Sequence, residues 1–273
     1  MSEPVSESLA ALYMTTAVEA VVRAGDIMLE HFGAGVDVRK KGSIDLVTNA
    51  DVAIEREFRR MMAARFPAHA ILGEEMGGEA AVVEGPCWVF DPIDGTTNFA
   101  HGIPIFCASL ALEIDGVPQL AAVYDPNRRE LFTAERGRGA FLNGVPMRVS
   151  QAPSLIESVL VTGFPYDVHD RLDEIVGLFR RFVGRARAVR RLGTAALDLC
   201  YVAAGRMDGF WERGLHPWDI AGGAMLVAEA GGRVTGFGGQ PFSSRAGDVL
   251  ASNGQIHDAM LAVIAEHTQA SAS

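Results

Sequence analysis

The sequence has few cysteines, no long apolar run and no N-terminal targeting pattern, and each absence excludes a class of protein. Three cysteines in 273 residues, Cys87, Cys107 and Cys200, lie far apart and form no CxxC pair, so a secreted disulfide framework is not expected. No run approaches the roughly 18 apolar residues of a membrane-spanning helix. The first residues lack the basic and apolar regions of a signal peptide. We therefore expect a soluble cytoplasmic protein with reduced cysteines and no membrane partner.

Positive charge is also scarce. The formal net charge of −10 argues against broad binding to nucleic acids or anionic membranes. The exception is a dense group that we call the arginine cluster: Arg180, Arg181, Arg185, Arg187, Arg190 and Arg191. It could contact RNA, a polyanionic substrate or a second subunit, or it could be a solvated helix end followed by an edge strand. It is the only candidate patch for nucleic acid.

The sequence contains neither a dinucleotide-binding loop nor internal repeats. The stretch from 137 to 144 is rich in glycine, but its spacing is not GxGxxG and it lies between expected strands, so a β-turn is the better interpretation. A chain of 273 residues is near the size at which one core divides into two. We expect a single domain over 1–273 with two closely packed subdomains, approximately 9–150 and 151–265.

Apolar periodicity and turn residues predict helices and strands along the whole chain. The first half should contain helices over 9–32 and 52–66, a short buried strand over 87–90 and an antiparallel meander over 103–149. The second half should contain strands over 158–162, 209–211 and 249–251, helices near 171–183 and 218–230, and an apolar stretch over 195–203. This alternation indicates an α/β protein.

The most informative motif follows the expected buried strand and reads DPIDGTTNF, from Asp91 to Phe99. It sets two carboxylates, Asp91 and Asp94, a free carbonyl and two hydroxyls around a glycine turn. We expect Asp91 at the exit of the strand, with Pro92 and Gly95 stopping the strand and turning the chain. Ligands commonly bind at such strand ends in layered α/β folds, so the motif is typical of a metal and phosphate site.

The two carboxylates of this motif require a positive charge nearby. They repel each other when ionised, and burial makes the repulsion worse. No Lys or Arg occurs between Arg65 and Arg128, so no local side chain can neutralise them, although a salt bridge from a distant segment is possible. Hard oxygen ligands without interleaved Cys or His favour Mg²⁺ over zinc. The alternative is that Asp91 caps a turn and Asp94 caps the next helix.

Three more acidic positions have similar local settings. Glu74 follows an apolar run and a glycine, Asp219 lies at the start of an expected helix, and Asp51 lies at another helix N-terminus. Each has an ordinary explanation when taken alone: a solvated turn for Glu74, a charge favouring the helix dipole for Asp219 and an N-cap for Asp51.

Together these segments resemble the inositol monophosphatase family of Mg²⁺-dependent, lithium-sensitive phosphatases. The matching motifs are GEE at 73–75, DPIDGTTNF at 91–99 and WDIAGG at 218–223, supported by DLVTNAD at 45–51, GAFLNG at 139–144 and the stretch 193–219. The last stretch is most similar to the bacterial inositol monophosphatases. The resemblance implies a single phosphatase domain with a five-layer α/β/α/β/α sandwich, the fold type shared with fructose-1,6-bisphosphatase, and a homodimer.

The resemblance also implies a set of metal ligands. One Mg²⁺ would be bound by Glu74, Asp91 and the backbone carbonyl of Ile93, and a second by Asp91, Asp94 and Asp219. A third, weaker Mg²⁺ near Glu74 is implied as well. A bridging carboxylate such as Asp91 brings two cations to within about 4 Å of each other. At that separation one ion can activate water while the other stabilises the leaving oxygen.

Further catalytic roles follow from the same resemblance. Besides Glu74, the catalytic residues would be Thr96 and Asp51, which match a water-orienting pair, and Lys40, which matches a lysine on a mobile catalytic loop. The backbone amides of Gly95 and Thr96 would bind phosphate oxygens. Water would attack directly and in line, because no Ser, Cys or His is placed as a nucleophile beside a base. Lys40 could alternatively be a solvated loop charge.

The substrate is expected to be a phosphate monoester of a polyol. The residues implied to meet its hydroxyls are Asp94, Gly193, Thr194, Ala195, Glu212 and Asp219. Myo-inositol 1-phosphate fits this set best, whereas fructose 1,6-bisphosphate, histidinol phosphate and 3′-phosphoadenosine 5′-phosphate are the competing substrates. Glu212 could instead form a surface ion pair, since it lies beside Arg213. Because one enterobacterial relative of the family acts with the transcription machinery, a regulatory RNA-associated role is the alternative from a different class.

Overall fold

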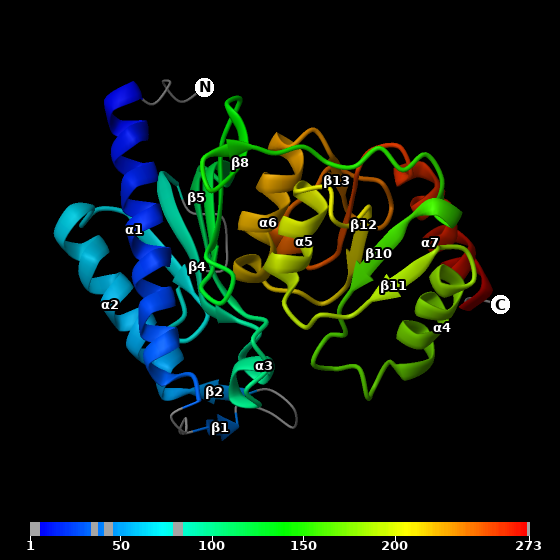
Figure 1. The fold of residues 1–273 in the computed structure, drawn as a ribbon, viewed down its shortest axis with the longest axis horizontal. Helices are drawn as coiled ribbons and strands as arrows, with labels where there is room; N and C mark the ends of the chain where they lie inside the picture. Colours follow the sequence, from blue (N-terminus) through cyan, green and yellow to red (C-terminus); the bar gives the residue numbers. More distant parts are fainter. Residues whose placement is uncertain (1–5, 34–37, 41–45, 79–83, 272–273) are drawn as a thin grey trace.

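The computed structural model describes residues 6–33, 38–40, 46–78 and 84–271. Two β-sheets alternate with three layers of helices (Figure 1). Helices α1 and α2 cover the outer face of the first sheet, α5 and α6 lie between the sheets, and α4 and α7 cover the outer face of the second. The predicted α/β/α/β/α sandwich is therefore confirmed. Within the described residues, no helix combines the length and the apolar character needed to cross a membrane.

The first sheet is a seven-stranded sheet in the order β3-β4-β5-β6-β7-β8-β9. Its strands are β3 (Ala70–Gly73), β4 (Pro86–Asp94), β5 (Cys107–Ile114), β6 (Val117–Asp125), β7 (Glu130–Glu135), β8 (Gly139–Leu142) and β9 (Val145–Pro146). Strands β3 and β4 are parallel, and every later pair is antiparallel, so the predicted meander is confirmed. The turns at Asp115-Gly116 and Asn143-Gly144 have two successive positive φ angles, as tight hairpin turns require.

Strand β4 corrects one prediction, because it continues through Pro92 as far as Asp94. The pairing with β5 is regular up to Asp91 and resumes at Asp94 after a shift in register. Pro92 is tolerated inside the strand because it lies in this irregular stretch, where its missing N–H removes no regular ladder bond. Both carboxylates of the motif thus lie on one strand, and Gly95 ends it.

The helices outside the first sheet begin with polar caps. Helix α1 (Glu7–His31) is capped by Ser6, and α2 (Asn49–Arg65) by Thr48, three residues earlier than predicted. Asp51 is therefore the third residue of α2 and not its N-cap: it completes a capping box with Thr48. The short strands β1 (Val38–Lys40) and β2 (Leu46–Thr48) pair below these helices, beside α3 (Thr96–Ala100) (Figure 1).

The second sheet has five strands in the order β11-β10-β12-β14-β13. Its elements are β10 (Val159–Thr162), β11 (Ala188–Arg190), β12 (Gly209–Glu212), β13 (Arg233–Thr235) and β14 (Val249–Ser252), with helices α4 (Leu172–Val183), α5 (Ala195–Ala203), α6 (Pro217–Glu229) and α7 (His257–Ser271). Strands β10, β11 and β12 are parallel, whereas β14 is antiparallel to both of its neighbours. The predicted elements are present, but β13 and α7 were not predicted.

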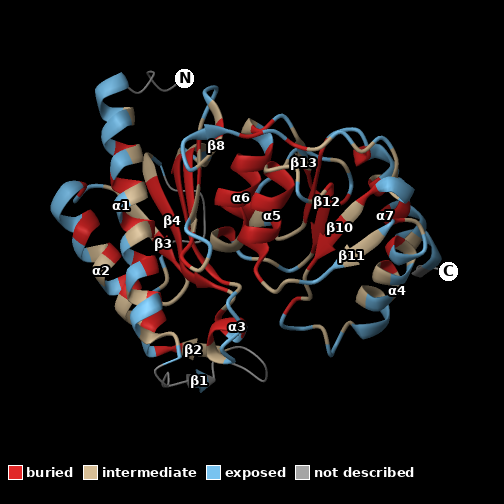
Figure 2. Cartoon of the chain, viewed as in Figure 1, coloured by how far each residue is buried: buried red, intermediate tan, exposed pale blue. Residues whose placement is uncertain are grey.

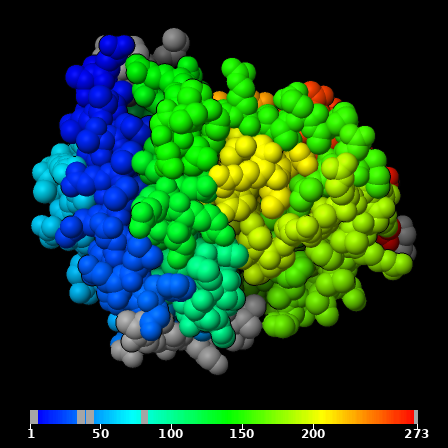
Figure 3. All heavy atoms as spheres, viewed as in Figure 1, coloured from blue at the N-terminus to red at the C-terminus, as the bar shows by residue number. Residues whose placement is uncertain are grey.

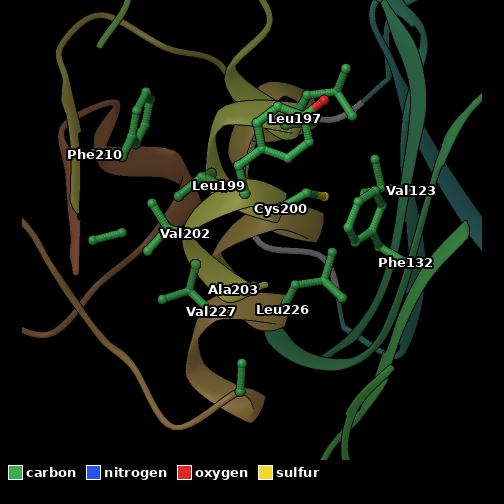
Figure 4. Close-up of a cluster of buried hydrophobic side chains, with 14 of the residues drawn as sticks. Val123, Phe132, Leu197, Leu199, Cys200, Val202, Ala203, Phe210, Leu226 and Val227 are labelled. Carbon is green, nitrogen blue, oxygen red and sulfur yellow. The ribbon is translucent and has the colours of Figure 1, made fainter. Parts of the chain in front are cut away.

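The middle helices join the two sheets into one packed unit. All residues of α5 are buried, which explains why its sequence, 195–203, reads as an apolar stretch without polar alternation (Figure 2). Leu199 and Cys200 of α5 lie between Val123 and Phe132 of the first sheet and Phe210 of the second (Figure 4). The two halves are also in direct contact on the surface (Figure 3). We propose that the subdomain boundary lies near residue 150, between the two sheets.

Truncation of Phe90 should destabilise the fold strongly. Its ring is fully buried in β4 and stacks on Phe58 of α2 with centroids 4.2 Å apart. We expect Phe90→Ala to lower the free energy of unfolding by about 3–5 kcal/mol, measured by urea denaturation. The control Val145→Ala, at a side chain that is 64% exposed, should change it by less than about 0.5 kcal/mol. Equal losses in the two variants would contradict this view of the core.

Candidate active site

Asp91 lies at the centre of an acidic cluster at the end of β4. The residue is only 2% exposed, and its Oδ1 atom has no hydrogen-bond partner among the described residues. Burial raises the pKa of Asp91 well above its ordinary value, and the charges of Glu74, Asp94, Asp219 and Asp51 raise it further. The carboxylates that the sequence predicted to converge are thus close enough to repel one another.

Glu74 is placed beside Asp91 by the parallel pairing of β3 and β4. Gly73 is paired with Phe90, so Glu74 leaves β3 next to the position where Asp91 follows in β4. The backbone amide of Glu74 donates to the carbonyl of Phe90, with an N···O distance of 3.3 Å. The turn after β3, which by itself could account for an acid at position 74, therefore also places the Glu74 carboxylate in the acidic cluster.

Asp94 links the first sheet to the start of α5. Its Oδ2 atom accepts hydrogen bonds from the Thr194 hydroxyl and the Ala196 backbone amide, both at 2.6 Å. Burial raises the pKa of Asp94 to about 6, and the bonds from Thr194 and Ala196 act in the opposite direction. The predicted substrate residues Thr194 and Ala195 are therefore held against the predicted ligand Asp94.

Asp219 is the third residue of α6, which begins at Pro217 and packs across five strands of the first sheet, β4 to β8. Its Oδ2 atom accepts the backbone N–H of His216 at 2.7 Å, which fixes the first turn of the helix. Burial raises the pKa of Asp219 well above its ordinary value, followed by the charges of Asp94 and Glu74. Asp219 can therefore stabilise the start of α6 and belong to the acidic cluster at the same time.

Asp51 and Thr96 form a buried polar pair next to the cluster. The Thr96 hydroxyl lies 2.9 Å from the carbonyl oxygen of Ile93 and 3.4 Å from Oδ1 of Asp51, so its single proton is shared between two acceptors. The other Asp51 oxygen accepts the backbone N–H and the hydroxyl of Thr48, at 2.8 and 2.5 Å. Asp51 therefore serves the capping box with one oxygen and faces Thr96 with the other.

Gly95 makes the sharp turn between β4 and α3. Its φ of +97° is in the left-handed region, and an added Cβ would lie 3.0 Å from the carbonyl oxygen of Ile105, so only glycine fits without strain. Asn98 lies one turn later and was given no role from the sequence. Its amide donates to the carbonyls of Ile105 and Leu192, at 2.9 and 2.8 Å, which joins the motif to the segment before Gly193.

A cleft between the two halves brings the predicted substrate residues together. It is lined by Asp94–Thr97 from the first half and by Gly163–Tyr166, Arg191, Gly193–Ala195, Glu212, Gly214, Leu215 and Asp219 from the second. All six predicted substrate residues are in this lining. Of the remaining predicted site residues, Gly95 and Thr96 line the cleft, whereas Asp51, Glu74, Asp91 and Ile93 do not.

Glu212 lies in β12 and is only 6% exposed, which is inconsistent with the alternative of a surface ion pair. Burial raises its pKa to about 8, although the charge of Arg191 opposes the shift. Asp198 lies in α5 nearby, and neither of its buried carboxylate oxygens has a hydrogen-bond partner in the described ranges of the chain. Burial and then the charges of Glu212 and Asp94 raise the pKa of Asp198 well above its ordinary value. No pattern in the sequence marks this acid, because it lies in an apolar helix.

The donor set of the cluster fits a hard cation. It consists of carboxylate oxygens with one adjacent carbonyl, and the buried Oδ1 of Asp91 needs a positive partner. Across the described ranges, no group of three or more His, Cys, Asp or Glu side chains could hold a metal ion in the arrangement that the structure shows. Lys40 ends β1, but its side chain lies outside the described part of the chain, so its role remains a prediction.

Comparisons with known proteins place this chain in a family. The model of the inositol monophosphatase family matches residues 11–270. The inositol-1-monophosphatase of Synechocystis is 43% identical over 259 residues, covering 94% of this chain and 90% of that protein. The Nus factor SuhB of Salmonella typhimurium is 43% identical over 251 residues, covering 91% and 94%.

Solved structures agree with these sequence matches. The inositol monophosphatase from Anabaena aligns with a TM-score of 0.85 at 39% identity, covering 94% of this chain and 96% of that one. A structure described as an IMPase/NADP phosphatase complexed with Mg²⁺ and phosphate aligns with a TM-score of 0.79 at 26% identity, covering 89% and 91%. The resemblance found in the motifs is thereby confirmed: the chain belongs to the inositol monophosphatase family.

Proposed function

We propose that this protein is a Mg²⁺-dependent phosphatase whose preferred substrate is myo-inositol 1-phosphate. The observation that carries the proposal is the buried Oδ1 of Asp91, which no described residue partners and which lies among four further carboxylates. Such a group of like charges is costly unless a cation accompanies it. Family membership supports the phosphatase activity, and one structural neighbour is described with Mg²⁺ and phosphate bound.

Two or three Mg²⁺ ions would be held by the oxygens of the acidic cluster. The proposed ligands are Glu74, Asp91, the Ile93 carbonyl, Asp94 and Asp219. When bound, Mg²⁺ supplies Lewis-acid chemistry and lowers the pKa of water. Thr194 donates a hydrogen bond to Oδ2 of Asp94, and His216 donates one to Oδ2 of Asp219. These bonds orient both carboxylates before a metal ion binds.

The protein's own groups would orient the reacting water and the phosphate. The Thr96 hydroxyl has two acceptors, Ile93 O and Asp51 Oδ1, so it can turn its proton to Asp51 and accept a hydrogen bond from the water. The backbone amides of Gly95 and Thr96, at the cleft wall, would donate to phosphate oxygens. Lys40 would approach from the β1 segment.

Substrate hydroxyls would bind on the other side of the cleft. Glu212 and Asp94 offer carboxylate oxygens, and Thr194 offers a hydroxyl, which together favour a polyol over an apolar group. The cleft also contains one basic residue among its described lining, Arg191, which is exposed. A substrate with a second phosphate, such as fructose 1,6-bisphosphate, is therefore the main competitor.

The direct test is a phosphate-release panel. Myo-inositol 1-phosphate, fructose 1,6-bisphosphate, histidinol phosphate and 3′-phosphoadenosine 5′-phosphate should each be assayed with Mg²⁺, with EDTA and with added Li⁺. The proposal expects the highest kcat/KM for inositol 1-phosphate, no turnover in EDTA and inhibition by Li⁺. Turnover that persists in EDTA would overturn the metal dependence, and a higher kcat/KM on another substrate would overturn only the substrate.

A second candidate function is a regulatory binding role, and relatives named Nus factor SuhB favour it. Arg181 and Arg185 of the arginine cluster share Glu266 as an ion-pair partner, whereas Arg180, Arg187 and Arg190 are exposed. These side chains could contact an anionic partner.

The other proposed partner is a second copy of this chain in a homodimer, which sedimentation analysis would test. The proposed homodimer is supported by an exposed apolar face of α4, which consists of Leu172, Val176 and Val183.

Asp94→Asn should separate the two functions. The substitution removes one carboxylate charge from the acidic cluster and leaves the arginine cluster untouched. We expect it to abolish phosphate release while RNA binding, measured by filter retention, stays at the wild-type level. Parallel loss of both activities in a folded variant would contradict this separation.

Asp91→Asn should be the most damaging single change for activity. Loss of even an outer-shell partner of a metal typically costs 10- to 100-fold, so loss of the proposed bridging ligand should lower kcat/KM by at least about 100-fold. In EDTA the same variant should be at least as stable as the wild type, because a repelled buried charge is removed. Asp258→Asn, on an exposed ion pair with Arg233, is the control. Near-wild-type turnover of Asp91→Asn would refute the bridging role.

Glu212→Gln should change how stability depends on pH. The pKa of Glu212 is raised from 4.5 to about 8 in the folded protein, so the folded state binds this proton more tightly than the unfolded state. The free energy of unfolding should therefore fall as the pH rises from 4.5 to about 8. We expect the variant to flatten this fall in urea titrations performed in EDTA. An unchanged pH profile would show that Glu212 does not carry a raised pKa.

A further inference from the structure

Glu55 of helix α2 lies outside the substrate cleft, yet its buried carboxylate holds the loop that carries Glu74. The side chain is completely buried. One oxygen, Oε2, accepts the backbone N–H of Glu75 at 2.7 Å, and the other, Oε1, accepts the backbone N–H of Met76 at 3.1 Å. Two successive amides of the loop after β3 therefore converge on one carboxylate, in the manner of an anion-binding turn.

Arg59, one helical turn after Glu55, completes this arrangement. Its Nε atom lies 2.9 Å from Oε1 of Glu55, and its Nη2 atom donates to the carbonyl of Gly77 at 2.5 Å. The guanidinium therefore neutralises the buried carboxylate and binds the far end of the same loop. A buried carboxylate is stable only when it is paired and hydrogen-bonded in this way.

Gly73 shows how closely the loop approaches Glu55. A Cβ atom at this position would overlap the Glu55 carboxylate, so the glycine of the GEE motif is required by the contact. The amide of Gly73 also donates to the carbonyl of Gly77 at 3.3 Å, which closes the loop on itself. The contact therefore constrains both ends of the turn that contains Glu74.

The two amides that flank the Glu74 side chain have different partners. Its own N–H is bonded to Phe90 of β4, and the next N–H, from Glu75, is bonded to Glu55 of α2. Asp51 precedes Glu55 by four residues and lies on the same face of α2, where it meets Thr96. A single rigid helix thus fixes the loop of one proposed ligand and the proposed water-orienting pair.

We infer that Glu55 is a positioning residue for the metal site: it sets the position of the Glu74 carboxylate relative to Asp91 through the loop amides. This inference rests on the proposed function, because Glu74 is a proposed ligand. Glu55 itself binds no ion in this account, since both of its oxygens are occupied by the loop and Arg59. Its removal should weaken metal binding without removing a ligand.

Isothermal titration with Mn²⁺ in the presence of inorganic phosphate tests this directly. Glu55→Gln keeps the size of the side chain but points an NH₂ group at one of the loop amides. We expect the dissociation constant for Mn²⁺ to rise by about tenfold or more, as for other outer-shell partners of metal ligands. Glu55→Asp, which keeps the charge on a shorter side chain, should show a smaller rise. Glu57→Gln is the matched control, because Glu57 lies on the same helix and its ion-pair partners among the described residues are Arg23 and Arg60.

A double-mutant cycle distinguishes positioning from general stability. If Glu55 acts through Glu74, adding Glu55→Gln to Glu74→Gln should weaken Mn²⁺ binding no further, although it still lowers the free energy of unfolding. Wild-type affinity in a folded Glu55→Gln or Glu55→Asp variant would overturn the inference and leave the proposed function intact. Absence of Mn²⁺ binding in the wild-type protein would overturn the proposed function and this inference with it.

Discussion

Repulsion among buried carboxylates at the end of β4 is the constraint on which the rest of the site depends. Within the part of the chain that the structure describes, one oxygen of Asp91 has no hydrogen-bond partner, and the residue lies among Glu74, Asp94, Asp219 and Asp51. A fold can hold such a group only if packing elsewhere offsets the cost, and a bound cation lowers it. The buried middle layer of α5 and α6 supplies that packing, because it joins both sheets into one core. The structure is therefore organised to keep negative charges close together.

The acids reach the cluster from four segments of the chain, since only Asp91 and Asp94 share an element, β4. Backbone hydrogen bonds hold most of them in place. Asp51 and Asp219 are both third residues of helices, and each accepts a backbone N–H at the start of its helix. Asp94 accepts the first amides of α5. These helix-start amides favour negative charge. The hydrogen bond that makes Asp219 resemble an ordinary helix-start residue thus also orients the carboxylate of this proposed ligand.

Much of the fold could be predicted from the sequence, because helix periodicity, hairpin turns and the long meander are local signals. Local signals failed where the structure depends on distant contacts. Pro92 does not stop β4, since an irregular pairing with β5 accommodates it. The roles of Asn98 and Glu55 were missed, because each depends on contacts with a segment elsewhere in the chain. The acidic residues proposed for the site could be predicted because their motifs are distinctive, whereas Asn98 and Glu55 have no such signal.

The central claim is that Asp91 lies where a divalent cation binds. Anomalous diffraction from crystals soaked in Mn²⁺ and phosphate tests it most directly, because it locates the ions without assuming any activity. The account predicts anomalous peaks in contact with the Asp91 carboxylate, with oxygens of Glu74, Asp94 and Asp219 completing the ligand sets. Peaks confined to other parts of the molecule, or an Asp91 carboxylate without an ion at saturating Mn²⁺, would contradict it.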